Sequence, residues 1–435
     1  MFRFGRAAAA ALIWIVAGCT GGRVVDVEVE TRTDATGAGA VVVAYGGLYG
    51  LDALDLGPAD ASPWTVATTG VAVRTVNGKR RLEPLAKGGA LPAVVVVSIA
   101  PAPLGVQSAA NTLGGSGFVV STAALRPTAE RVTSRLSFSA PPRGVAAAQG
   151  QAKARLADWS PADGAADRVF IGPADLRATK SAAFVFDSST PGWIRSEAAR
   201  LAERLAPAFE KATGRPASRP DVFVGLRSEG DALAWRADAR DGQIVLEFLG
   251  PYWRDSGPDS GERLQRAVAS ELAAVELADL AAKKPPTWIS DGIADALADE
   301  AMTTAGLWTR DDALRSAADV SRRCAESLAS ATLVALATQG EAARACGHAF
   351  ARAGAGTKGV AAFARDLGKR LDSDRKAQSG AGKDADAFLR VAAAHAGAHN
   401  AALMRTLMSA TGTEAAAALS ALSVNERGEP AHVRR

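Results

Sequence analysis

The pattern of apolar and polar positions changes character near Pro191. Before that residue, short apolar runs rich in β-branched and aromatic residues alternate with Gly and Pro, which is typical of strands in a sandwich-like domain. We therefore expect a β-rich domain over residues 41–185, preceded by a Gly- and Thr-rich tether at 19–40. The clearest strand candidates are residues 41–45, 93–99, 117–121, 131–138 and 169–171.

Beyond Pro191, apolar residues recur at helical spacing. The spacing predicts helices over 193–213 and 262–283 and a third that begins at Pro285-Pro286 and reaches about Met302. Two strands are predicted between the first and second helices, at 221–226 and 243–249. The expected fold class is α+β, with a mixed domain at 186–310 and an Ala-rich helical region at 311–435.

The first twenty residues have the pattern of a targeting segment. Arg3 and Arg6 precede an apolar run over residues 7–16, which is too short to span a bilayer but suits the core of a signal peptide. The run ends in Val-Ala-Gly-Cys at 16–19, which resembles the lipobox of bacterial lipoproteins. That resemblance implies a signal peptide at 1–18 and a lipid on Cys19. The alternative is an ordinary secretion signal with an incidental cysteine.

The lipobox also bears on localisation. In the sorting of such lipoproteins, Thr20 rather than Asp after the lipidated cysteine favours the outer membrane. The resemblance therefore implies a protein of the bacterial envelope, anchored to the outer membrane and facing the periplasm.

Charge and cysteine content narrow the possibilities. Removal of Arg3 and Arg6 would lower Lys+Arg from 50 to 48 against 46 Asp+Glu, and without a basic block this gives no support for nucleic-acid binding. Cys324 and Cys346 would be the other cysteines of the mature chain. In an oxidising envelope they are a disulfide candidate, with two buried free thiols as the alternative.

Two predicted helices resemble the zinc site of the gluzincin peptidases, specifically the aminopeptidase N-like and glycyl aminopeptidase-like groups. These enzymes place His-Glu-x-x-His on one helix and a ligand Glu, within Trp-Leu-x-Glu-Gly-x-Ala, on the next. Residues 288–297 read Trp-Ile-Ser-Asp-Gly-Ile-Ala-Asp-Ala-Leu, with Asp291 at the position of the ligand Glu. On the preceding helix, Glu271 matches the general base, while Ser270 and Ala274 replace both histidines.

The resemblance therefore implies a degenerate site from which zinc is lost. Ala274 has no donor atom, Ser270 is a poor zinc ligand, and Asp291 is one methylene shorter than Glu. Family members also use a downstream Tyr to stabilise the oxyanion, but Tyr45, Tyr49 and Tyr252 all precede Asp291. No catalytic residue or cofactor is expected, and Glu271 is a vestige of the general base.

Other candidate motifs are weaker. His395 and His399 have the spacing of a metal-binding pair but lack an intervening Glu and an obvious third ligand, so we interpret them as ordinary helix residues. The Gly-Gly-Ser-Gly run at 114–117 is interpreted as a turn between strands.

The sequence thus leaves three functions open. The first is a lipid-anchored pseudoenzyme that binds a peptide or an envelope protein in the former substrate cleft. The second is an active envelope hydrolase with unusual metal ligation or none. The third is a structural envelope lipoprotein without a ligand.

Overall fold

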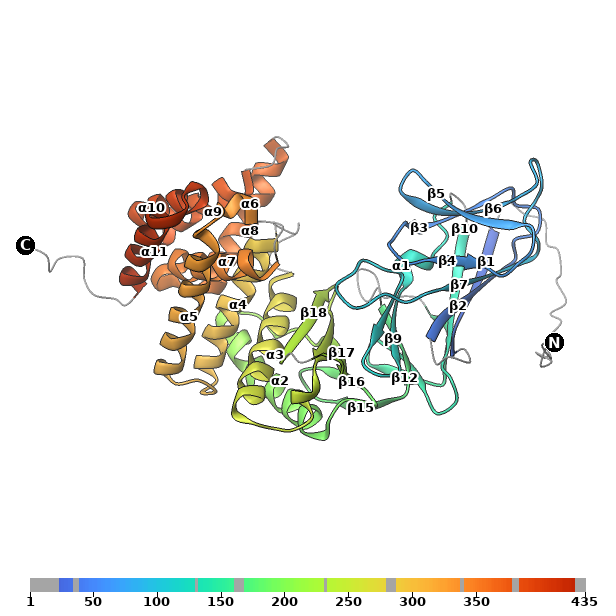
Figure 1. Cartoon of the computed structure of the whole chain (residues 1–435), viewed down its shortest axis with the longest axis horizontal. Helices are drawn as coiled ribbons and strands as arrows, with labels where there is room; N and C mark the ends of the chain where they lie inside the picture. The colour runs from blue at the N-terminus through green and yellow to red at the C-terminus, as the bar shows by residue number, and fades with distance from the viewer. Residues whose placement is uncertain are drawn as a thin grey trace, which may run out of the picture.

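The computed structural model describes residues 23–33, 39–129, 132–159, 168–230, 233–278, 287–336, 340–377 and 383–426. The predicted signal peptide and Cys19 lie outside these residues, as does the connection 279–286 between the two helices of the candidate site. The described chain is α+β as expected, with sheets at its N-terminal end and helices at its C-terminal end (Figure 1).

The N-terminal domain is a β-sandwich. We call its six-stranded layer the outer sheet, with the strand order β13-β10-β1-β2-β7-β4. Its strands are β1 (Arg23–Thr33), β2 (Gly39–Gly46), β4 (Trp64–Val66), β7 (Val94–Ile99), β10 (Val132–Ser139) and β13 (Arg155–Trp159). A small sheet of β3 (Leu54–Pro58), β5 (Val71–Val76) and β6 (Lys79–Pro84) and the short helix α1 (Thr122–Leu125) pack at its side.

The second layer of the sandwich, the inner sheet, has the order β12-β11-β14-β9-β8. Its strands are β8 (Ala110–Leu113), β9 (Gly117–Ser121), β11 (Val145–Ala148), β12 (Gln151–Lys153) and β14 (Arg168–Gly172). Inward-facing residues of both sheets, such as Val27 and Val97 of the outer sheet and Val120 and Ile171 of the inner one, form a common core.

The start of the first strand corrects one prediction. Residues 23–33, which lie largely within the predicted tether, form β1, and β1 pairs with β10 from Arg23 onwards. Buried Val25, Val27 and Val29 alternate with charged residues, which is the two-residue repeat of a half-buried strand. Gly- and Thr-rich residues on either side of this alternation favoured a tether over a strand in the prediction from sequence.

A third, central sheet joins the sandwich to the helices. Its order is β15-β16-β17-β19-β18, with strands β15 (Ala174–Ala178), β16 (Ala183–Asp187), β17 (Asp221–Arg227), β18 (Ala234–Arg240) and β19 (Gln243–Leu249). The predicted domain boundary at 185/186 is therefore wrong, because it cuts through β16. One face of the sheet, including Val185, Phe223 and Val245, packs on the inner sheet, and the opposite face packs on helices.

Buried polar groups fasten this junction between the inner and central sheets. Glu247 has no exposed surface and accepts hydrogen bonds from the Gly114 amide at 3.1 Å and from Arg227 at 3.0 Å. Gly114 adopts φ +64° in the predicted turn between β8 and β9, and Gly115 donates to Asp187 at 3.3 Å. The glycines therefore allow backbone amides to reach two buried carboxylates.

The helices cover the other face of the central sheet (Figure 1). A single apolar core extends from α2 to α11, so the region beyond 311 shares its core with the preceding domain. No helix among the residues described could cross a bilayer. The helices are α2 (Gly192–Thr213), α3 (Pro258–Ala278), α4 (Thr287–Thr304), α5 (Arg310–Leu328), α6 (Leu333–Leu336), α7 (Gly340–Ala355), α8 (Val360–Ala377), α9 (Lys383–Ala396), α10 (Ala398–Ser409) and α11 (Gly412–Glu426).

Candidate functional site

The candidate site lies where α3, α4 and α7 meet. Gly292 of α4 and Gly347 of α7 face each other so closely that a Cβ on Gly347 would lie 1.8 Å from the carbonyl oxygen of Trp288. A disulfide between Cys324 of α5 and Cys346 holds α7 next to α5, with the two Cα atoms 4.7 Å apart. The position of α7 is thus set by a close helix crossing and by a covalent link.

The structure brings the sequence-predicted site residues together. Ser270, Glu271 and Ala274 lie on α3, and Asp291 lies on α4. Ser270 and Asp291 line a cleft of about 1290 Å³, while Glu271, Ala274 and Asp291 line a smaller adjoining cavity of about 350 Å³. The predicted juxtaposition of the two helices is therefore present.

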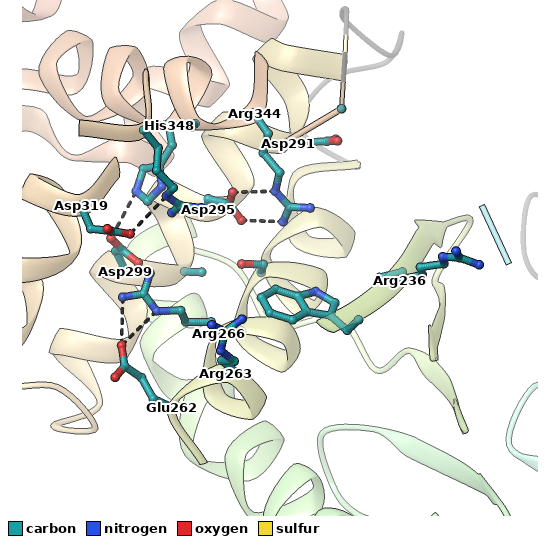
Figure 2. A pocket seen from close by; sticks show the side chains of 18 of the residues that line it. Arg236, Glu262, Arg263, Arg266, Asp291, Asp295, Asp299, Asp319, Arg344 and His348 are labelled. Carbon is teal, nitrogen blue, oxygen red and sulfur yellow. Dashed lines mark hydrogen bonds and ion pairs between the residues drawn. The ribbon is translucent and has the colours of Figure 1, made fainter. Parts of the chain in front are cut away.

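A residue that the sequence analysis did not identify occupies the centre of this site. Arg344 of α7 lines both cavities and makes a bidentate ion pair with Asp295 of α4, with Nε–Oδ2 and Nη2–Oδ1 distances of 2.6 Å each. Its Nη2 lies 3.8 Å from Oε1 of Glu271. Figure 2 shows the guanidinium of Arg344 directed at the Asp295 carboxylate.

The pairing continues along both helices. Asp295 and Asp299 of α4 are one helical turn apart, and so are Arg344 and His348 of α7. Oδ2 of Asp299 lies 3.2 Å from Nε2 of His348 and accepts a hydrogen bond from Ser316 at 3.0 Å. The floor of the cleft therefore carries two successive contacts between α4 and α7, the Asp295–Arg344 ion pair and the Asp299–His348 contact (Figure 2).

The buried charges change the acidity of two carboxyl groups. Burial raises the pKa of Glu271 to about 7, against the opposing attraction of Arg344. Burial alone would also raise the pKa of Asp295, but the charge and hydrogen bonds of Arg344 outweigh it and hold that pKa below its ordinary value. Burial therefore dominates at Glu271, whereas the ion pair dominates at Asp295.

The donor set does not fit zinc. A structural or catalytic zinc site needs at least three protein ligands with suitable lone pairs, and Ala274 supplies none. No group of three or more His, Cys, Asp or Glu side chains with the geometry of a metal site occurs among the described residues. The guanidinium of Arg344 is a permanent cation beside the carboxylates, so a metal ion here would meet a positive charge.

The walls of the cleft come from three parts of the chain. Trp235 and Arg236 belong to β18, which forms an edge of the central sheet. Residues 103–106 of the sandwich domain lie opposite, and Arg236 donates to the Leu104 carbonyl at 3.5 Å. On the helical side, the guanidinium of Arg266 lies 5.0 Å from the ring centre of Trp308. The cleft thus combines a strand edge with aromatic and cationic side chains.

The remaining candidates lie away from the cleft. Tyr45 is buried in the sandwich and donates to the Leu125 carbonyl at 3.2 Å, whereas Tyr49 and Tyr252 are exposed. His395 ends α9 and contacts Asp366 at 2.9 Å, and His399 belongs to α10 beyond Gly397. The two histidines are on different helices and do not share a helix face.

Comparison with known proteins gives structural matches only. Neither the known family models nor the curated protein sequences match this chain. Among solved structures, the chain is similar to an aminopeptidase N family protein from Idiomarina loihiensis, with a TM-score of 0.49 and 13% identity over 88% of this chain and 73% of that one.

Two further solved structures also match. The M1 zinc metallopeptidase from Deinococcus radiodurans matches with a TM-score of 0.46 and 16% identity, covering 93% of each chain. Yeast LTA4 hydrolase matches with a TM-score of 0.46 and 13% identity, covering 80% of this chain and 62% of that one.

Proposed function

We propose that this protein is a lipid-anchored component of the bacterial envelope that binds an extended peptide segment in the cleft without zinc-dependent catalysis. The observation that carries the proposal is Arg344. Its guanidinium pairs with Asp295 and approaches Glu271 between the two helices on which the resemblance would place a metal site.

The charge balance of the floor supports the non-catalytic part of the proposal. Arg344 supplies the positive charge that buried carboxylates require. Ala274 offers no donor atom beside Glu271, and Nη2 of Arg344 lies 3.8 Å from its Oε1. The oxyanion Tyr that the resemblance implies has no counterpart in the cleft, since all three tyrosines lie elsewhere. The site therefore lacks the groups that a zinc peptidase uses on a peptide bond.

The shape of the cleft supports the binding part. Its volume of about 1290 Å³ exceeds that of an ordinary small-molecule site and suits several peptide residues. Because β18 is an edge strand of the central sheet, a peptide can add beside it through backbone hydrogen bonds. Trp235 then offers flat apolar surface to its side chains.

A peptide array probed with the full-length purified protein tests this function. Trp235→Ala combined with Arg236→Ala should weaken the best peptide about tenfold or more, which is a loss of about 1.4 kcal/mol. Arg200→Ala is the control, because Arg200 is an exposed arginine of α2 paired with Glu197, away from the cleft. If the double variant binds the peptide as tightly as Arg200→Ala and the unmodified protein do, the peptide does not bind in the cleft.

Two other outcomes would favour the alternatives. Time-dependent cleavage of the bound peptides that resists chelators would support a metal-independent hydrolase. Failure to bind any peptide above background would support a structural lipoprotein.

The anchor needs a test of its own. Cys19→Ala should abolish incorporation of a clickable fatty acid and release the protein from the membrane fraction or leave it unprocessed. Equal labelling and retention of the variant would contradict the lipid attachment.

A further inference from the structure

Exposed apolar residues gather at one end of the outer sheet, where β1 begins. Tyr49 is 80% exposed, Val94 49% and Val24 37%, and Pro92 and Ala93 beside Val94 are also exposed. We call these five residues the β1 rim. They belong to three segments that are far apart in the sequence.

The strand register places these segments side by side. Asp26 of β1 is paired with Gly46 of β2, which is paired in turn with Val94 of β7. Beyond that row, a Cβ on Gly47 would lie 2.9 Å from the Val24 carbonyl oxygen, and the Leu48 amide donates to the Ala93 carbonyl at 3.2 Å. The chain leading to Tyr49 therefore runs between the starts of β1 and β7.

The rim faces away from the cleft. Side chains alternate across a strand, and Val25 of β1 and Val95 of β7 are fully buried in the sandwich core. Val24 and Val94 therefore point outward from the outer sheet. The inner sheet separates the outer sheet from the central sheet that carries the cleft, as the layers in Figure 1 show.

The position of the proposed lipid sets the distance from the rim to the membrane. Three residues lie between Cys19 and Arg23, where pairing of β1 begins, so four residue steps join the two. Even fully extended, four residues span at most about 14 Å. A lipid on Cys19 therefore keeps the start of β1 within that distance of the bilayer.

We propose that the β1 rim rests on the bilayer surface and orients the cleft towards the periplasm. This inference depends on the lipid attachment included in the proposed function. Tyr side chains favour the membrane–water interface, and small apolar side chains contribute by burial at the boundary of headgroups and acyl chains. Exposed Arg23 and Asp52 lie nearby and carry opposite charges, so the contact is mainly apolar.

Spin labelling of the full-length lipidated protein in phosphatidylethanolamine–phosphatidylglycerol vesicles tests this surface. Tyr49→Cys receives the label, and Tyr252→Cys is the matched control, because Tyr252 is an exposed tyrosine (61%) outside the sandwich domain. Cys324 and Cys346 are disulfide-bonded and fully buried. The label at 49 should collide several-fold more often with oxygen, which dissolves in the bilayer, than with a water-soluble nickel complex.

The control label at 252 should show the opposite preference, and a second rim label at Val94→Cys should behave as the label at 49 does. The same preparations are assayed for fatty acid on Cys19. A lipidated protein with water-exposed labels at both rim positions would overturn the rim proposal and leave the anchor intact. Absence of the fatty acid would contradict the anchor itself and, with it, the distance argument.

Discussion

The junction between the sheets and the floor of the cleft both bury charged groups, but they satisfy them in different ways. At the junction, Glu247 and Asp187 accept hydrogen bonds from amides of the glycine turn at 114–115, and Arg227 also donates to Glu247. At the floor, Asp295 depends on the side chain of Arg344 from another helix.

This difference separates a structural joint from the candidate site. Backbone amides in a tight turn are fixed by the chain, and their hydrogen bonds leave no room for a ligand. A side chain on a separate helix can change in one substitution while the helices stay in place. The ion pair at the cleft floor can therefore change by substitution without a change of fold.

The largest expected effect is at the junction. Arg227→Ala leaves the fully buried Glu247 with the Gly114 amide but without its cation, and breaking such a pair should cost about 3–5 kcal/mol. Chemical denaturation measures the loss. Arg322→Ala, which removes an exposed arginine of α5, is the control and should change stability little. Similar effects of the two substitutions would mean that the buried pair has no special role.

The second effect concerns the support of the floor. Replacing both Cys324 and Cys346 by Ala removes a link across 22 residues and should lower the free energy of unfolding by about 3 kcal/mol in the chain-entropy model. Because the link holds α7, hydrogen exchange should rise first in α7 and not at the turn 114–117. An equal rise of hydrogen exchange in α7 and in the turn 114–117 would contradict the idea that the disulfide supports the cleft floor alone.

The third and smallest effect is the pH dependence at Glu271. Its pKa rises from 4.5 to about 7 on folding, so the native state binds the proton more tightly than the unfolded chain. The contribution is fully present below about pH 4.5 and is lost as pH rises through about 7, and between about pH 5 and about pH 8 it should fall by about 2–3 kcal/mol. Glu271→Gln should be less sensitive to pH in this window, as measured by denaturation at about pH 5 and about pH 8. An unchanged pH profile would show that Glu271 titrates normally.

Local periodicity predicted much of the fold. The helical stripe of Ala198, Leu201 and Leu205 gave α2 almost to the residue, and the β-branched runs gave β17 and β19. The strand β18 was not predicted from the sequence, because buried and exposed residues do not alternate cleanly along it. One face of β18 packs on a helix and its edge lines the cleft, so most of its residues are half-buried. The boundary at 185/186 failed because β14 and β16 are both hydrophobic on two faces and look alike in sequence.

The sequence predicted residues of the candidate site on α3 and α4, but none of those on α7. A local motif identified Ser270, Glu271, Ala274 and Asp291, since each lies within one helix of a recognisable pattern. Arg344 lies 49 residues from Asp295 in the chain, and nothing local links them. The four-residue spacing of Asp295 and Asp299, repeated in Arg344 and His348, is visible in the sequence, but only the packing of α4 on α7 shows that the two series pair.

We propose that Arg344 supplies the positive charge in a site where Ser270, Ala274 and Asp291 have replaced zinc ligands. The most direct test is the zinc content of two purified variants after zinc loading. Both carry Ser270→His, Ala274→His and Asp291→Glu, which restore the ligand set on α3 and α4, and the second also carries Arg344→Ala. The account predicts far less than one zinc per chain when Arg344 is kept and close to one when it is removed. Stoichiometric zinc in the variant that keeps Arg344, or in the unmodified protein, would contradict it.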